Sequence, residues 1–218
     1  MILIRGTVER LPLADNSVDM IFTDPPYLHE YLSAYGWLAD EAMRVLRPGG
    51  FVLALCGGAY LNECLRQFDT SGLTFYWLYQ LELTGGVTGI VWPRGNQKVH
   101  ISTRVKHYAA YSKGPSLSRT CTVGKFTDTG GDKRFHIWGQ DVASARYYID
   151  CFTSPGDLVL DPFIGGGTTA VACKLIDRRC IGMDIDTAAL TITQRRLDGD
   201  VLISATPLLD YVVELMPE

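Results

Sequence analysis

The chain has 218 residues, of which 47% are hydrophobic and 20% charged, and its formal net charge is −4. This composition is typical of a soluble globular protein, and the length suits one domain spanning residues 1–218. No stretch reaches the ~18 apolar residues of a membrane span, and the N-terminal apolar stretch is too short for a signal peptide.

Short apolar runs alternate with helical patterns, which predicts a mainly parallel sheet of about seven strands covered by helices. Strands are expected at 18–23, 51–56, 75–83, 107–112, 158–160 and 180–183. Helices are expected at 32–46, 59–68, 143–152, 168–175 and 187–197. Around Gly85, Pro93 and Gly95 we expect a loop, and about 113–140 an irregular insertion. Residues 199–218 carry no motif. The predicted fold class is α/β, Rossmann-like and doubly wound.

Charge is unevenly distributed along the chain. Residues 94–134 contain nine basic and two acidic residues, a net +7, so the rest of the chain carries −11. Such asymmetry suits a protein with one face against a phosphate backbone, and it equally fits a solvated basic loop.

The six cysteines are scattered and never form a C-x-x-C pair. This pattern indicates reduced thiols in a cytoplasmic protein, because a disulfide framework or a zinc site needs paired spacing. No cluster of Cys, His and acidic residues has metal-ligand spacing, so we expect no metal.

A glycine-rich turn lies between a predicted strand and a predicted helix, in Asp161-Pro162-Phe163-Ile164-Gly165-Gly166-Gly167-Thr168-Thr169. Glycines there let the backbone approach a ligand at the carboxyl edge of the sheet. Asp184 follows Gly165 by 19 residues, the spacing of an acid that binds a ribose in Rossmann-like folds. The spacing does not separate a dinucleotide from S-adenosylmethionine, although Asp161 suits a cationic amino group that only the latter has.

A second motif, Asp24-Pro25-Pro26-Tyr27, directly follows the predicted strand 18–23. Its prolines stiffen the loop, so the Asp24 carboxylate and the Pro25 carbonyl can accept the two hydrogens of a planar amine. Tyr27 offers a face on which a base can stack. A strand that ends at prolines, with Asp24 capping the turn, is the structural alternative.

Together the two motifs resemble those of the DNA amino-methyltransferases, which modify adenine N6 or cytosine N4. Asp24–Tyr27 resembles the catalytic motif and Asp161–Thr169 the cofactor motif, in the permuted, beta-type order. The resemblance implies an S-adenosylmethionine-dependent methyltransferase fold, with double-stranded DNA as the partner. The implied cofactor-binding residues are Asp161, Pro162, Phe163, Gly165, Gly167, Thr168, Thr169 and Asp184. The basic residues expected to contact DNA are Arg94, Lys98, Arg104, Lys106, Lys125, Lys133 and Arg134.

The chain departs from the family at two places. Trp138-Gly139-Gln140-Asp141-Val142 stands where a Lys-Pro pair usually contacts the cofactor, and the short insertion replaces a full target-recognition domain. The resemblance implies transfer to a flipped base, adenine N6 first because the tetrapeptide begins with Asp, with cytosine N4 as the alternative. A non-catalytic DNA-binding subunit, an RNA amino-methyltransferase and a nucleotide-dependent oxidoreductase are the remaining hypotheses. The expected protein is cytoplasmic and associated with the nucleoid through DNA. Enzymes that it resembles often pair, so the resemblance implies a homodimer.

Overall fold

The computed structural model describes residues 1–6, 9–26, 29–83, 88–94, 97–115, 127–128 and 142–199. Within these ranges, only the backbone is described for residues 83–102 and 127–128. Every statement below about the structure concerns these residues.

An eight-stranded sheet forms the centre of the molecule, in the order β1-β10-β9-β2-β3-β7-β4-β8. Its strands are β1 (Ile2–Arg5), β2 (Val18–Thr23), β3 (Leu46–Cys56), β4 (Thr74–Leu83), β7 (Val105–Ser112), β8 (Thr127–Asp128), β9 (Leu158–Asp161) and β10 (Arg179–Asp184). β7 is antiparallel to both β3 and β4, whereas the other five pairings are parallel. Since β8 has only two residues, the predicted mainly parallel sheet of about seven strands is confirmed.

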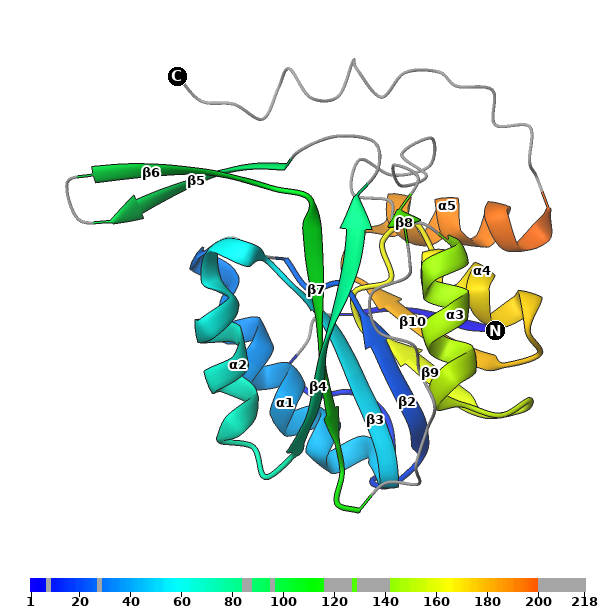
Figure 1. Cartoon of the computed structure of the whole chain (residues 1–218). Helices are drawn as coiled ribbons and strands as arrows, with labels where there is room; N and C mark the ends of the chain where they lie inside the picture. Colours follow the sequence, from blue (N-terminus) through cyan, green and yellow to red (C-terminus); the bar gives the residue numbers. More distant parts are fainter. Residues whose placement is uncertain are drawn as a thin grey trace.

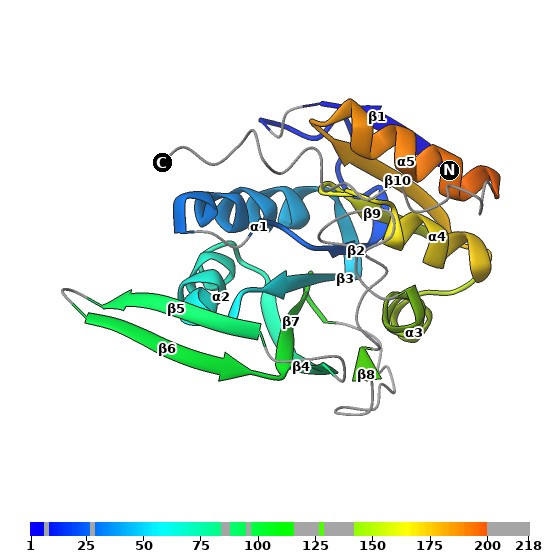
Figure 2. The ribbon, with the colours of Figure 1, turned by 90° about the horizontal axis from the view of Figure 1, so that it is seen from above.

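Helices cover both faces of the sheet (Figures 1 and 2). α1 (Ser33–Val45) and α2 (Leu61–Asp69) lie on one face, and α3 (Val142–Phe152), α4 (Thr168–Leu175) and α5 (Thr187–Asp198) on the other. Two short 3-10 helices, η1 (His29–Tyr31) and η2 (Gly58–Tyr60), follow β2 and β3. The doubly wound prediction is therefore confirmed. None of the described helices is long and apolar enough to cross a membrane.

The side chains of β3 show why both faces are covered. Phe51, Leu53 and Leu55 belong to the core beneath α3 and α4, while the alternating Val52 and Ala54 belong to the core beneath α1 and α2. All five are at most 2% exposed. A strand buried on both faces carries a continuous apolar run, because successive side chains point to opposite sides.

The point where the sheet changes direction lies between β9 and β2. From β9 the chain passes to the neighbouring β10 on one side, whereas from β2 it passes to β3 on the other. Ligands of open α/β sheets bind beyond the carboxyl ends of the strands at such a point. The Asp24 motif follows β2 and the glycine turn follows β9, so both predicted motifs lie at this position.

The prediction of a loop around Gly85, Pro93 and Gly95 was wrong in part. Residues Thr88–Arg94 (β5) and Gln97–Thr103 (β6) pair as an antiparallel hairpin that extends away from the sheet (Figure 1). Pro93 and two glycines suggested a loop, but a two-stranded ribbon has free edges on which a proline costs no ladder hydrogen bond. Strand β1 was also missed, because its four residues are too few to show the alternation that distinguishes a strand from other apolar segments.

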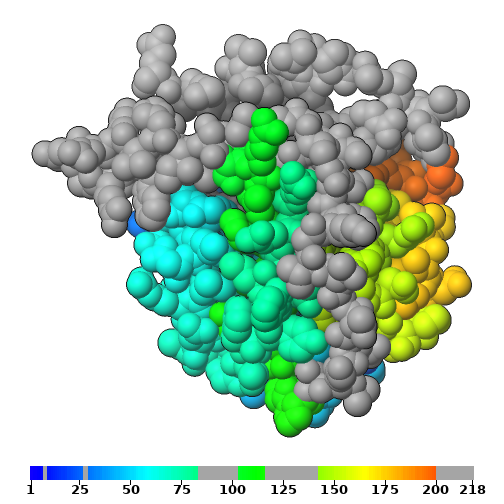
Figure 3. Space-filling view, viewed as in Figure 1, coloured from blue at the N-terminus to red at the C-terminus, as the bar shows by residue number. Residues whose placement is uncertain are grey.

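Strands β4 and β7 lie toward the edge of the sheet opposite β1 and reach the surface between α2 and α3 (Figure 3). Phe75 and Trp77 on β4 are each 49% exposed. The five described cysteines are free, and four of them are buried, as expected for reduced thiols. Cys121 lies outside the described residues, as do most of the predicted insertion and all of 200–218.

Candidate active site

The Asp24 motif, predicted to be catalytic, begins where β2 ends. Thr23 is the last strand residue and is buried, Asp24 is half-buried, and Pro25 is buried. Pro26 is half-buried, and Tyr27 lies outside the described residues. Because prolines fix φ, the chain leaves the strand along a restricted path. The Asp24 carboxylate is therefore held at the carboxyl edge of the sheet, beside the end of β9.

A buried carboxylate joins the two motifs. Asp161, at the end of β9, is 3% exposed and accepts a hydrogen bond from the Thr23 hydroxyl at 2.7 Å. Its other oxygen accepts from the Thr169 hydroxyl at 2.6 Å, and the Phe163 N–H donates to Oδ1 at 3.1 Å. Thr23 and Asp161 are 138 residues apart in the chain. One carboxylate thus fixes the end of β2, the glycine turn and the first turn of α4 relative to one another.

Burial raises the pKa of Asp161 to about 6, and the nearby Asp184 carboxylate adds to this effect. Hydrogen bonds from Thr169, Thr23 and the Phe163 N–H favour the charged form and oppose the increase. In the folded protein the pKa of the Asp161 carboxyl therefore exceeds its ordinary value of 3.8. The stability linked to this group is fully present below about pH 4 and is lost as pH rises through about 6.

We expect the difference in stability between wild type and Asp161→Asn to depend on pH. When the pH falls from about 7.5 to about 5, the free energy of unfolding of the wild type should rise by roughly 1 kcal/mol relative to that of the variant. The reason is that residue 161 binds a proton on folding only in the wild type. Urea unfolding of both proteins across this range measures the difference, in which the titration of all other groups cancels. A constant difference, or a relative loss at the lower pH, would contradict the proposed burial effect.

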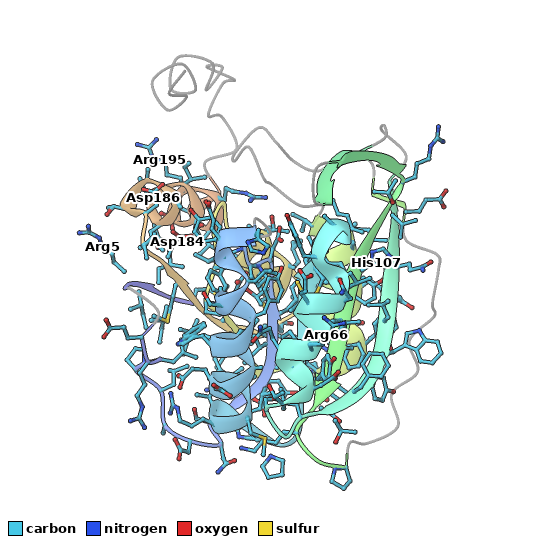
Figure 4. All side chains as sticks on the ribbon, turned by 90° about the vertical axis from the view of Figure 1, so that its left-hand side faces the viewer. Arg5, Arg66, His107, Asp184, Asp186 and Arg195 are labelled. Carbon is cyan, nitrogen blue, oxygen red and sulfur yellow. The ribbon has the colours of Figure 1, made fainter. Side chains whose placement is uncertain are left out.

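The glycine turn is held from several sides. Gly165 N–H donates to Asp184 Oδ2 at 2.9 Å, and Asp186 N–H donates to Asp184 Oδ1 at 2.9 Å. Asp184 ends β10 and lies near Asp186, where α5 begins (Figure 4). Asp184, which the sequence predicts to bind a ribose, thus also anchors the glycine turn by a direct hydrogen bond.

Helix α5 holds the carbonyls of the same turn. The Thr193 hydroxyl donates to Gly165 O at 2.9 Å, and the Arg196 guanidinium donates to Gly166 O. Gly167 has φ +82°, and a Cβ there would lie 2.6 Å from a Thr193 side-chain atom. Glycine is therefore needed at Gly167 both for its conformation and for its close contact with α5. Sequence reasoning missed Thr193 and Arg196, because nothing in a helical pattern marks them.

The remaining predicted cofactor residues lie in the same turn. Pro162 is buried, Phe163 is half-buried, and Thr168 and Thr169 begin α4. Thr168 is half-buried, and Thr169 is 4% exposed. All eight predicted residues are thus brought together at the ends of β9 and β10.

The predicted DNA-binding residues are only partly described. Arg104, which directly precedes β7, is exposed, and Lys106, near the start of β7, is half-buried. Arg94 and Lys98 belong to β5 and β6, where only the backbone is described. Lys125, Lys133 and Arg134 lie outside the described residues.

Solved structures share this architecture. The chain superposes on PvuII DNA methyltransferase (cytosine-N4-specific) with a TM-score of 0.72 and 17% identity, covering 89% of this chain and 85% of that one. It superposes on the M1.HpyAVI–SAM complex with a TM-score of 0.66 and 22% identity, covering 84% and 89%. The protein therefore has the Rossmann-like methyltransferase fold.

Sequence comparisons relate the chain to DNA methyltransferases in particular. A DNA methylase family model matches residues 129–195, and a methyltransferase domain model matches residues 1–54. Type II methyltransferase M.HpaI of Haemophilus parainfluenzae is 26% identical over 222 residues, covering 86% of this chain and 70% of the relative. Type II methyltransferase M2.DpnII of Streptococcus pneumoniae is 26% identical over 235 residues, covering 84% of each. Over most of its length the chain is therefore similar to DNA methyltransferases, and each of the two motifs lies within one of the matched segments.

Proposed function

We propose that this protein methylates the exocyclic N6 amine of adenine in DNA. The observation that carries the proposal is the Thr23–Asp161 hydrogen bond of 2.7 Å, which places the Asp24 motif directly beside the glycine turn. A methyl donor in that turn and a base amine at Asp24 would then be neighbours. Adenine is proposed because the tetrapeptide begins with Asp, the residue that the family's adenine enzymes tend to have there.

The residues of the turn fit S-adenosylmethionine. Asp184 is half-buried, and each of its oxygens accepts one backbone N–H, which leaves acceptor capacity for the hydroxyls of a ribose. The glycines at 165–167 have no side chains, so a ligand can approach the backbone of the turn closely. When bound, S-adenosylmethionine supplies an electrophilic methyl group.

The residues of the catalytic motif would orient the amine. In this mechanism the target base leaves the duplex, at a cost of a few kcal/mol, and stacks on Tyr27. The Asp24 carboxylate and the Pro25 carbonyl accept its two amine hydrogens, which draws the nitrogen lone pair out of conjugation with the ring. Positioning and a fixed electrostatic environment would then favour direct in-line transfer of the methyl group from sulfur to the amine nitrogen, without a covalent enzyme intermediate. S-adenosylhomocysteine would leave, and the amine would lose one proton to Asp24 or to water.

We further propose that the basic segment binds DNA. Between Glu82 and Asp128 the sequence has seven basic residues and no acidic one. The β5–β6 hairpin belongs to this segment and follows β4, whose carboxyl end lies at the same edge of the sheet as those of β2 and β9. A two-stranded ribbon fits the major groove of B-DNA. The hairpin is therefore suited to contact DNA next to the site of methyl transfer.

Cytosine N4 is the second candidate, favoured by the similarity to the cytosine-N4-specific PvuII enzyme. Mapping modified bases in DNA from cells that express the wild type or Asp24→Ala separates the two. We expect N6-methyladenine at a defined sequence in the wild type alone. N4-methylcytosine would favour the second candidate, and unmodified DNA in both strains would argue for a non-catalytic DNA-binding subunit.

A further inference from the structure

A tryptophan outside both motifs contacts the cofactor turn. Trp37 lies on α1, the helix that follows the catalytic loop, and is half-buried. Its ring packs edge-to-face against Phe163 of the glycine turn, with ring centroids 6.0 Å apart and an interplanar angle of 84°. Its indole N–H donates to the carbonyl of Glu9 at 3.2 Å. One side chain thus links α1, the β1–β2 connection and the cofactor turn.

The turn is held from opposite faces of the sheet. Ile164 is 4% exposed and belongs to the core beneath α3 and α4, and α5 on the same face binds the carbonyls of Gly165 and Gly166. Phe163 instead contacts Trp37 on the α1 face. Since Phe163 N–H also donates to Asp161, Phe163 connects Trp37 to the carboxylate that joins the motifs.

The position of α1 itself is fixed well away from the turn. Arg44, near the end of the helix, donates to the carbonyls of Leu11 and Leu13 and pairs with Glu41 at 2.6 Å. Glu41 in turn accepts from the Leu11 N–H at 2.8 Å. Because these contacts hold the helix independently of Trp37, truncating the indole removes support from the turn without releasing α1.

We propose that Trp37 is a positioning residue, which acts through Phe163 to hold the cofactor turn in its binding conformation. This inference rests on the proposed use of the turn for S-adenosylmethionine. Both rings are half-buried, so their contact lies at the rim of the core and its loss opens no large internal cavity. The contact therefore affects the turn more than the stability of the fold.

Calorimetric titration with S-adenosylmethionine, in the absence of DNA, tests the proposal. Trp37→Ala should weaken binding by roughly 3- to 10-fold, the effect expected for loss of one edge-to-face ring pair. Trp37→Phe keeps a ring opposite Phe163 and loses the N–H to Glu9, so it should bind nearly as well as the wild type. Phe163→Ala should weaken binding too, and adding Trp37→Ala to it should produce little further change.

A matched control comes from β4. Phe75 packs edge-to-face against Tyr111 at 5.4 Å and 78°, far along the sheet from the cofactor turn, so Phe75→Ala should leave the affinity unchanged. In steady-state methylation, Trp37→Ala should raise KM for S-adenosylmethionine and leave kcat near that of the wild type. A wild type that binds while Trp37→Ala binds equally well would overturn this inference alone. A wild type that fails to bind would overturn the proposed function as well.

Discussion

Replacing Asp24 with alanine should lower kcat for DNA methylation by on the order of 10²- to 10³-fold. The carboxylate is one of only two acceptors proposed for the amine hydrogens, and loss of one preorganised polar contact to the reacting group has effects of this size. Affinity for S-adenosylmethionine should stay near that of the wild type, because Asp24 lies outside the glycine turn. Single-turnover methylation and calorimetry measure the two quantities separately.

Asp40→Ala is the matched control for this variant. Asp40 is an exposed acid on α1, so its loss removes the same charge without touching the proposed site. Asp24→Asn keeps one carbonyl acceptor in nearly the same shape and should retain more activity than Asp24→Ala. Full activity of Asp24→Ala would remove Asp24 from the mechanism.

Replacing Gly167 with alanine should produce the largest loss of stability among substitutions in the cofactor turn. A left-handed conformation costs a non-glycine residue roughly 1–2 kcal/mol. The new Cβ would also lie 2.6–2.9 Å from three atoms of Thr193, which is fully buried, and overpacking adds roughly 1–3 kcal/mol. Urea unfolding should therefore show a loss of about 2–5 kcal/mol, together with weaker cofactor binding.

Gly199 separates the two contributions to that loss. It has φ +84°, nearly the same as Gly167, but a Cβ there would meet no atom of the described part of the chain within 4 Å. Gly199→Ala should therefore show the conformational cost alone, without the contact with Thr193. Equal losses for the two variants would mean that the fit between the turn and α5 contributes nothing.

The elements nearest the site could be predicted well from the sequence. β2, α4 and α5 match their expected bounds within one residue, because each combines a clear apolar period with a proline, glycine or capping signal at its ends. The sequence also predicted that each motif lies at the carboxyl end of a strand, whereas the pairing of β2 with β9, which makes the motifs neighbours, came only from the structure. Asp186, which caps α5 by accepting from the Ala188 N–H, is a signal of the same local kind.

The contacts that hold the site together could not be predicted. Thr23 and Asp161 are 138 residues apart, and Trp37 and Phe163 are also distant in the sequence, so no spacing relates them. The hairpin at 88–103 was missed because Pro93 and the glycines signal turns wherever they occur. Local sequence signals thus located the motifs, whereas the residues that position the motifs were identified only in the folded structure.

The central claim is that this chain transfers a methyl group to an exocyclic base amine of DNA. The most direct test incubates the purified wild type with S-adenosylmethionine carrying a deuterated methyl group and unmethylated DNA, followed by digestion to nucleosides and mass spectrometry. We predict deuterated N6-methyladenine in the wild type and almost none with Asp24→Ala. Deuterium on a carbon of cytosine, or no label in DNA despite bound S-adenosylmethionine, would contradict the claim.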